Sequence, residues 1–136
     1  MSWYIKELLR KPEIQKLLAE EKLDEIYSQC QWPGKLTDFF LSNGIDPLKY
    51  VTVIINNMYR MSKVESVIIP KTITAIEELA FQGCENLKYI EIPETINEIH
   101  YNAFNGCYRK QVTVRCKKGS VAHSFAKNIG FNLDLY

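Results

Sequence analysis

The stretch VESVIIPKTITAIEELAFQGCEN at residues 64–86 is followed at once by LKYIEIPETINEIHYNAFNGCYR at residues 87–109. Both carry an apolar strand ending in proline, two spaced isoleucines, an Ala-Phe pair and a Gly-Cys pair, each 23 residues from its counterpart. A fixed period of this length is typical of a solenoid, in which each unit buries its apolar side against its neighbours. The repeat therefore predicts a short stack of turns, and stacks of this kind mostly act by binding other molecules.

Alternation within each strand separates expected core residues from expected surface residues. In the second copy, Ile90 and Ile92 should point inward while Tyr89 and Glu91 point outward, because successive strand side chains face opposite sides. Pro93 lacks an N–H group and should close the strand. Successive strands should form a parallel ladder that stacks Ile69 on Ile92, Phe81 on Phe104 and Cys84 on Cys107.

The pattern continues in weaker form before the two clear copies. Counting back 23 residues from Pro70 gives Pro47, which predicts a degenerate first turn. In that register Tyr50 replaces Ile73, Val53 replaces Ile76, Asn57-Met58 replaces Ala80-Phe81, Met61 replaces Cys84 and Val64 replaces Leu87.

After the second copy the strand phase shifts by one residue, because Val112 and Val114 alternate where the period would place residues 113 and 115. Gly119-Ser120 then begins a predicted helix that ends at Gly130, and a final strand follows. The apolar side of the helix comprises Val121, Ala122, Phe125, Ala126 and Ile129, and the strand alternates through Phe131, Leu133 and Leu135.

The first 45 residues show helical rather than strand periodicity, with Pro12 placed to open a helix. Trp32-Pro33-Gly34 predicts a turn, Thr37 an N-cap and Gly44 the end of a short helix. We expect the apolar face of Leu17, Leu18, Leu23, Phe39 and Phe40 to pack as core against the first repeat rather than to form an open partner groove. The predicted fold class is α+β: a helical N-terminal cap over residues 1–45, then a short right-handed solenoid with a helix–strand C-terminal cap over residues 46–136, in one compact unit.

The repeat phrase closely resembles the treponemal-type, BspA-like class of leucine-rich repeats. That phrase runs from an I-x-I-P strand through I-x-x-I to A-F and G-C. The resemblance is close over residues 64–109, weak over 47–63, and extends through the Gly-Ser helix to residue 136. Members of the family are commonly long secreted or surface proteins of host-associated bacteria, and similar short versions occur in intracellular and phage-like settings. The resemblance implies a bacterial or phage protein that binds other proteins.

Bulk composition narrows the function classes. The chain has a net charge of +1, but residues 64–107 carry two basic and seven acidic groups, while residues 108–136 carry six basic and one acidic group. Apolar runs are too short for a membrane span or a signal peptide, so we expect a cytoplasmic protein. Cys30, Cys84, Cys107 and Cys116 are then expected to be free thiols.

No catalytic or metal-binding pattern emerges. His100 and His123 could be grouped with Cys107 and Cys116 as zinc ligands, but close ligand pairs are missing. A Cys–His nucleophilic pair is conceivable, yet a buried cysteine is a poor nucleophile. Glu77-Glu78 is better explained as a solvated face than as an acid–base pair. We therefore expect no enzyme activity, no cofactor and no small-molecule substrate.

The expected function is binding of a partner protein of unknown identity, by a monomer or weak homo-oligomer. The predicted contact face is the outward side of the strand ladder: Ser66, Ile68, Tyr89, Glu91, Thr113 and Arg115. One alternative is a small intracellular, phage-borne inhibitor or regulator that attaches stoichiometrically to a host protein. Another is nucleic-acid contact through Arg109, Lys110, Arg115, Lys117 and Lys118, against which the low net charge and sparse aromatic residues argue.

Overall fold

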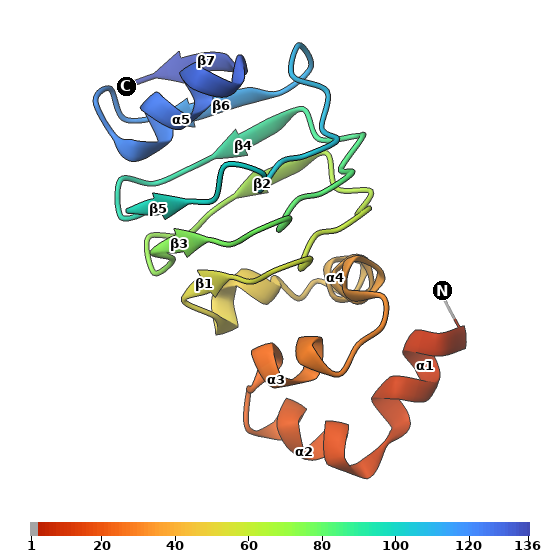
Figure 1. The fold of residues 1–136 in the computed structure, drawn as a ribbon. Helices are drawn as coiled ribbons and strands as arrows, with labels where there is room; N and C mark the ends of the chain where they lie inside the picture. The colour runs from red at the N-terminus through yellow and green to blue at the C-terminus, as the bar shows by residue number, and fades with distance from the viewer. Residues whose placement is uncertain (1–2) are drawn as a thin grey trace.

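The structure, a computed structural model, describes residues 3–136. It places the N-terminal helices at one end of two sets of stacked strands and a C-terminal helix at the other end (Figure 1). The helices are α1 (Trp3–Arg10), α2 (Pro12–Ala19), α3 (Leu23–Ser28), α4 (Pro33–Ser42), the 3₁₀ helix η1 (Pro47–Tyr50) and α5 (Val121–Ile129). The strands are β1 (Val53–Ile54), β2 (Ser66–Ile68), β3 (Ala75–Ile76), β4 (Tyr89–Glu91), β5 (Glu98–Ile99), β6 (Thr113–Cys116) and β7 (Asn132–Leu135). Helices and strands are thus mixed as α+β, as predicted.

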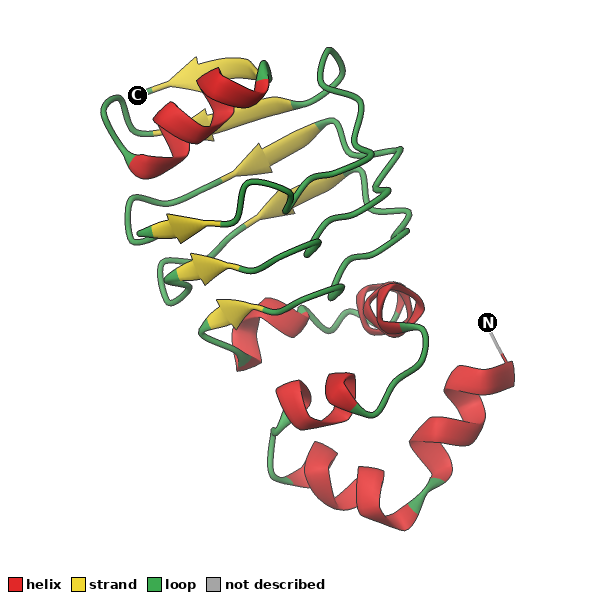
Figure 2. Cartoon of the chain, viewed as in Figure 1, coloured by secondary structure: helices red, strands yellow, loops and turns green. Residues whose placement is uncertain are grey.

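The strands form two parallel sheets, which the chain visits alternately from β1 to β6 (Figure 2). One sheet has the order β1-β3-β5 and the other the order β2-β4-β6-β7. In the second sheet Ile90 pairs with Val67 on one side, 23 residues away, and with Val114 on the other, 24 residues away. The one-residue shift after the second copy is therefore confirmed.

The core between the sheets stacks like residues on like. The rings of Phe81 and Phe104 are parallel within 1° with centroids 4.8 Å apart, and Tyr59 continues the column at 4.6 Å from Phe81. All three side chains are buried. The stacking of Phe81 on Phe104 is confirmed, and such offset aromatic pairs add to the free energy gained by burial.

The predicted register of the first turn is wrong by one residue. Val53 pairs with Ala75 and Ile54 with Ile76, an offset of 22 residues rather than 23. Tyr59 rather than Met58 therefore stacks on Phe81. The reason lies in the connection to β2, which is one residue shorter in this turn than in the next, so that the 23-residue offset returns only at Ser66 and Tyr89.

The start of α4 also differs from the prediction. Trp32-Pro33-Gly34 is not a turn, because α4 begins at Pro33, and Thr37 is a buried residue inside that helix rather than its N-cap. Proline suits the first position of a helix, where its missing N–H would be unpaired anyway. Gly34 allows this helix to approach the first turn, since a Cβ added to it would lie 1.7 Å from the carbonyl oxygen of Arg60.

Polar contacts connect α4 to the first turn of strands. The Thr37 hydroxyl donates to the carbonyl of Met58 at 2.5 Å, and the carboxylate of Asp38 accepts from the Ser62 hydroxyl at 2.5 Å. Of the apolar face predicted as core, Leu23 and Phe40 are buried while Leu17, Leu18 and Phe39 are partly buried against the same core. The helices thus pack on the strands rather than forming a separate group.

The C-terminal segment follows its predicted order of helix and strand. The Ser120 hydroxyl caps α5 by accepting from the backbone N–H of His123, and Gly130 ends the helix with φ +93°. Ala122 and Ala126 are buried, whereas Val121 is exposed, in contrast to its predicted place on the apolar side. β7 then adds to β6 in parallel, while α5 lies above β5 and covers the end of the shorter-stranded sheet (Figure 1).

Candidate partner-binding surface

The outward face of the β2-β4-β6-β7 sheet brings together all six residues predicted for the partner surface. Backbone pairing places Ser66, Tyr89 and Thr113 in one column, and Ile68, Glu91 and Arg115 in the next. β7 extends the columns with Asn132 and Asp134. These two residues were missed because the final strand was predicted without its parallel partner; the alternation of Leu133 and Leu135 was the signal that could have found them.

Arg115 forms ion pairs with carboxylates on both neighbouring strands of this face. Its Nε lies 3.7 Å from Oε1 of Glu91 and one terminal guanidinium nitrogen lies 3.2 Å from Oδ2 of Asp134. The guanidinium carbon also lies 4.8 Å from the centre of the Tyr136 ring. The hydrogen bond to Asp134 raises the pKa of Arg115, so the positive charge is held between two carboxylates. The column therefore alternates in sign along the sheet.

The other end of the face is apolar. Ile68 is 63% exposed and borders a hollow of about 130 Å³ lined mainly by Leu41, Leu48, Tyr59 and Val64. Leu41, near the end of α4, and Ile45, which follows α4, are exposed as well. An exposed isoleucine that adjoins other exposed apolar side chains is more informative than one standing alone. The face therefore offers an apolar end at β2 and a charged end at β6 and β7.

The basic cluster considered for nucleic acid is partly neutralised within the chain. Besides the pairs of Arg115, Nζ of Lys117 lies 2.9 Å from Oε2 of Glu94. The hydrogen bond from Lys117 lowers the pKa of Glu94 and keeps that carboxylate ionised. These exposed pairs add little stability, but they reduce the positive charge available to phosphates.

The histidines and the paired carboxylates make local contacts instead of a reactive group. Nδ1 of His123 accepts from the N–H of Gly119 at 3.0 Å, and Nδ1 of His100 accepts from that of Asn102 at 3.3 Å. Oε1 of Glu77 accepts from the N–H of Asn56 at 3.1 Å. Across residues 3–136 no three His, Cys, Asp or Glu side chains are grouped to hold a metal ion.

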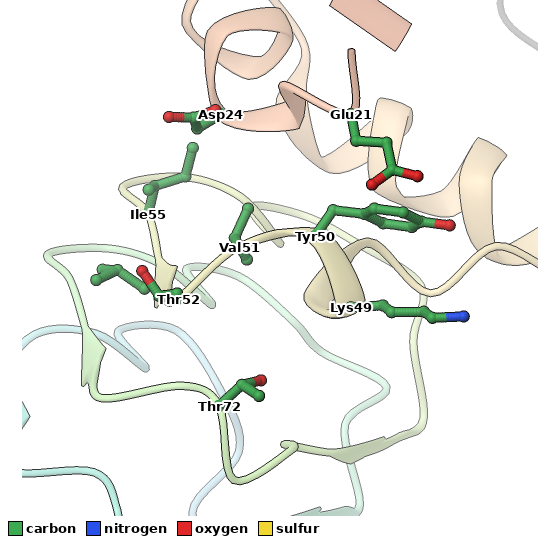
Figure 3. A pocket seen from close by; sticks show the side chains of 9 residues that line it. Glu21, Asp24, Lys49, Tyr50, Val51, Thr52, Ile55 and Thr72 are labelled. Atoms are coloured by element: carbon green, nitrogen blue, oxygen red, sulfur yellow. The ribbon is translucent and has the colours of Figure 1, made fainter. Parts of the chain in front are cut away.

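A second hollow of about 550 Å³ lies between the helical end and the first turn. Figure 3 shows Glu21, from the α2–α3 connection, and Asp24, from α3, facing Tyr50, Val51 and Ile55. Sequence reasoning missed it, because its two walls come from segments whose packing no local pattern specifies.

A 23-residue repeat, two parallel ladders and an exposed strand face together define a repeat protein of the leucine-rich class. The chain matches the BspA type leucine rich repeat region (6 copies) over residues 52–129, more than half its length, and it belongs to that family. Repeats of this family commonly mediate protein–protein interaction and are typically non-catalytic. Neither a curated protein sequence nor a solved structure gives a significant match. None of the helices described over residues 3–136 has the length and apolar character needed to cross a membrane.

Proposed function

We propose that this chain is a non-catalytic module that binds a partner protein through the outward face of the β2-β4-β6-β7 sheet. The observation that carries the proposal is the backbone register, which aligns Tyr89 beside Thr113 and Glu91 beside Arg115. The face includes an exposed isoleucine, a tyrosine and an arginine. Tyrosine and arginine are among the residues that most often carry the binding energy of protein interfaces.

The fold assigned to this module is a short solenoid with a cap at each end. We assign the helices within residues 3–45 to the N-terminal cap of the proposed 1–45 region, and α5 with β7 to the C-terminal cap of residues 46–136. The contacts of Thr37 with Met58 and of Asp38 with Ser62 support treating both parts as one unit. A short stack needs such closure because its end turns would otherwise expose apolar surface.

Rigidity is the second reason to favour this face. Arg115 is already held by Glu91 and Asp134, so it loses less rotamer freedom on binding than an unrestrained arginine would. The strands fix the spacing of the outward side chains. A partner would therefore meet a preorganised surface.

The test compares retention of partner proteins from a lysate of the source cells by wild type and by Tyr89→Ala/Arg115→Ala. A protein retained by wild type should bind the double variant at least ~10-fold more weakly, equivalent to ~1.4 kcal/mol. The matched control is Tyr101→Ala/Lys127→Ala, which removes an exposed tyrosine and an exposed base outside the sheet. It should bind like wild type, and circular dichroism should show nearly unchanged melting temperatures for both variants.

Normal binding by Tyr89→Ala/Arg115→Ala would refute the assignment of the face. Trp32→Ala changes an exposed residue at the helical end and serves as the second comparison. Loss of binding in that variant, with the double variant unaffected, would transfer the function to the helical cap.

A further inference from the structure

Two cysteines of adjacent turns lie one above the other. Cys84 and Cys107 occupy the same repeat position, and the backbone N–H of Gly83 donates to the carbonyl of Asn105 at 2.8 Å directly beside them. Neighbouring positions of a parallel ladder are about 4.8 Å apart, which is inside the range of about 4.4–6.8 Å that disulfides span between Cα atoms. A separation of one ladder step between the two residues is therefore compatible with a disulfide.

The two thiols point in the same direction, each toward the turn that precedes its own. The Cys84 thiol donates to the carbonyl of Tyr59 at 2.9 Å, and the Cys107 thiol donates to that of Phe81 at 3.2 Å. Each thiol is thus directed one turn toward the N-terminal end, so that Cys107 reaches down to the turn that contains Cys84. The carbonyl oxygen of Phe81 that accepts from the Cys107 thiol also accepts from the backbone N–H of Cys84 at 3.3 Å, so the Cys107 sulfur lies beside the backbone of Cys84.

The two cysteines differ in access and in acidity. Cys84 is fully buried, whereas Cys107 is partly exposed and lines a hollow of about 240 Å³ with Tyr101, Asn102 and Arg109. The hydrogen bond from Cys84 lowers the pKa of Cys107, and that contact together with burial raises the pKa of Cys84. Because the thiolate is the reactive form, Cys107 is the one of the pair that can react with an oxidant from solvent.

We propose that Cys107 is an oxidation site for peroxides and that Cys84 resolves it, producing a reversible disulfide between adjacent turns. The Cys107 thiolate attacks one peroxide oxygen, the O–O bond breaks, and a sulfenic acid forms as hydroxide leaves and takes up the proton that Cys107 released. The sulfur of Cys84 then attacks that of Cys107. The S–O bond breaks, the S–S bond forms, and the Cys84 proton leaves with the hydroxyl group as water. Two thiols lose two electrons, and the peroxide is reduced to two molecules of water.

The other two cysteines provide internal controls. Cys30 and Cys116 are both buried, and burial raises the pKa of each. Cys30 lies between α3 and α4, and Cys116 ends β6. Neither shares a repeat position with another cysteine.

The test treats the native full-length protein with a small excess of hydrogen peroxide and follows it by intact-mass spectrometry. Wild type, Cys30→Ser and Cys116→Ser should each lose two hydrogens, and non-reducing peptide mapping should link Cys84 to Cys107. A thiol reductant should reverse the change. The bond should raise the melting temperature by roughly 5 °C or more, since it closes a loop that the unfolded chain otherwise leaves open.

Variants of the pair separate the two roles. Cys107→Ser should show no disulfide and little oxygen uptake. Cys84→Ala should gain oxygen at Cys107, trapped as the dimedone adduct of the sulfenic acid. A disulfide formed in Cys107→Ser, a bond that involves Cys30 or Cys116, or oxidation of wild type only after unfolding in urea would each overturn the proposal. The measurement on wild type tests the proposed disulfide even if Cys84→Ala fails to fold.

Discussion

Gly34 lies where α4 packs against the turn that contains Arg60. A Cβ there would lie 1.7 Å from the Arg60 carbonyl oxygen, a backbone atom that cannot turn aside. We expect Gly34→Ala to lower the free energy of unfolding by about 2–4 kcal/mol, because either α4 or the first turn must move. Urea denaturation followed by circular dichroism measures the loss.

Gly44→Ala is the matched control for this substitution. Gly44 has φ +75° but no atom within 4 Å of an added Cβ, so the cost should be only the left-handed backbone penalty of about 1 kcal/mol. Equal losses in the two variants would show that α4 does not rest on Arg60 as described.

Two buried tyrosines should make the protein sensitive to alkali. Burial raises the pKa of Tyr27 and Tyr59 well above the ordinary value of about 10. Above that pH the unfolded chain releases these protons while the folded chain keeps them. The unfolded state then binds fewer protons, so stability falls as pH rises.

The slope of stability against pH above about 10 should be reduced in Tyr59→Phe, which removes one of the two groups. Tyr108→Phe, at an exposed position, should leave the slope unchanged. The free energy of unfolding, measured by urea titration at several pH values, provides the comparison. An unaltered slope in Tyr59→Phe would contradict the assigned burial.

At the scale of elements, the strands could be predicted where the sequence matches the repeat closely. Ile69, Ile90 and Ile92 are buried as expected, because alternation and period both specify the same inward face. The first turn was misassigned since its aromatic position holds Tyr59 rather than phenylalanine and its connection to β2 is shorter. Ser62, in the place of Cys84, could not be recognised because its role is to donate to Asp38 of α4.

The aromatic column offers a test of the stacked elements. Phe81 lies between the rings of Tyr59 and Phe104, so Phe81→Ala should leave a cavity and cost about 3–5 kcal/mol. Phe104→Ala should cost a similar amount, because its ring also contacts Phe125 and Phe131. Phe39→Ala, at a partly buried position, should cost less. Chemical denaturation measures the free energy of unfolding of the three variants. Unchanged stability in both Phe81→Ala and Phe104→Ala would refute the assigned register of the stacked turns.

At the scale of the whole molecule, the six outward residues could be placed from the sequence because the 23-residue period, the one-residue shift that follows it and the alternation within each strand specify which side chains of β2, β4 and β6 face outward. The contacts of the N-terminal helices could not be predicted in this way. Thr37 was assigned to a cap because threonine is common there, whereas its hydroxyl contacts Tyr27 and Met58 from inside a helix. Contacts between segments that share no period depend on packing, which local sequence patterns do not encode.

The cap assignment predicts that the strands depend on the helices. A fragment of residues 46–136 would lose the cover of α4, and Leu48, Met58 and Tyr59, all buried in the full chain, lie beside that boundary. We expect the fragment to bind a hydrophobic dye and to melt without a cooperative transition, because the exposed end turn cannot bury its apolar side. Thermal scans by calorimetry compare it with the full chain. A fragment that melts cooperatively at a similar temperature would show that residues 1–45 are an accessory to the solenoid rather than its cap.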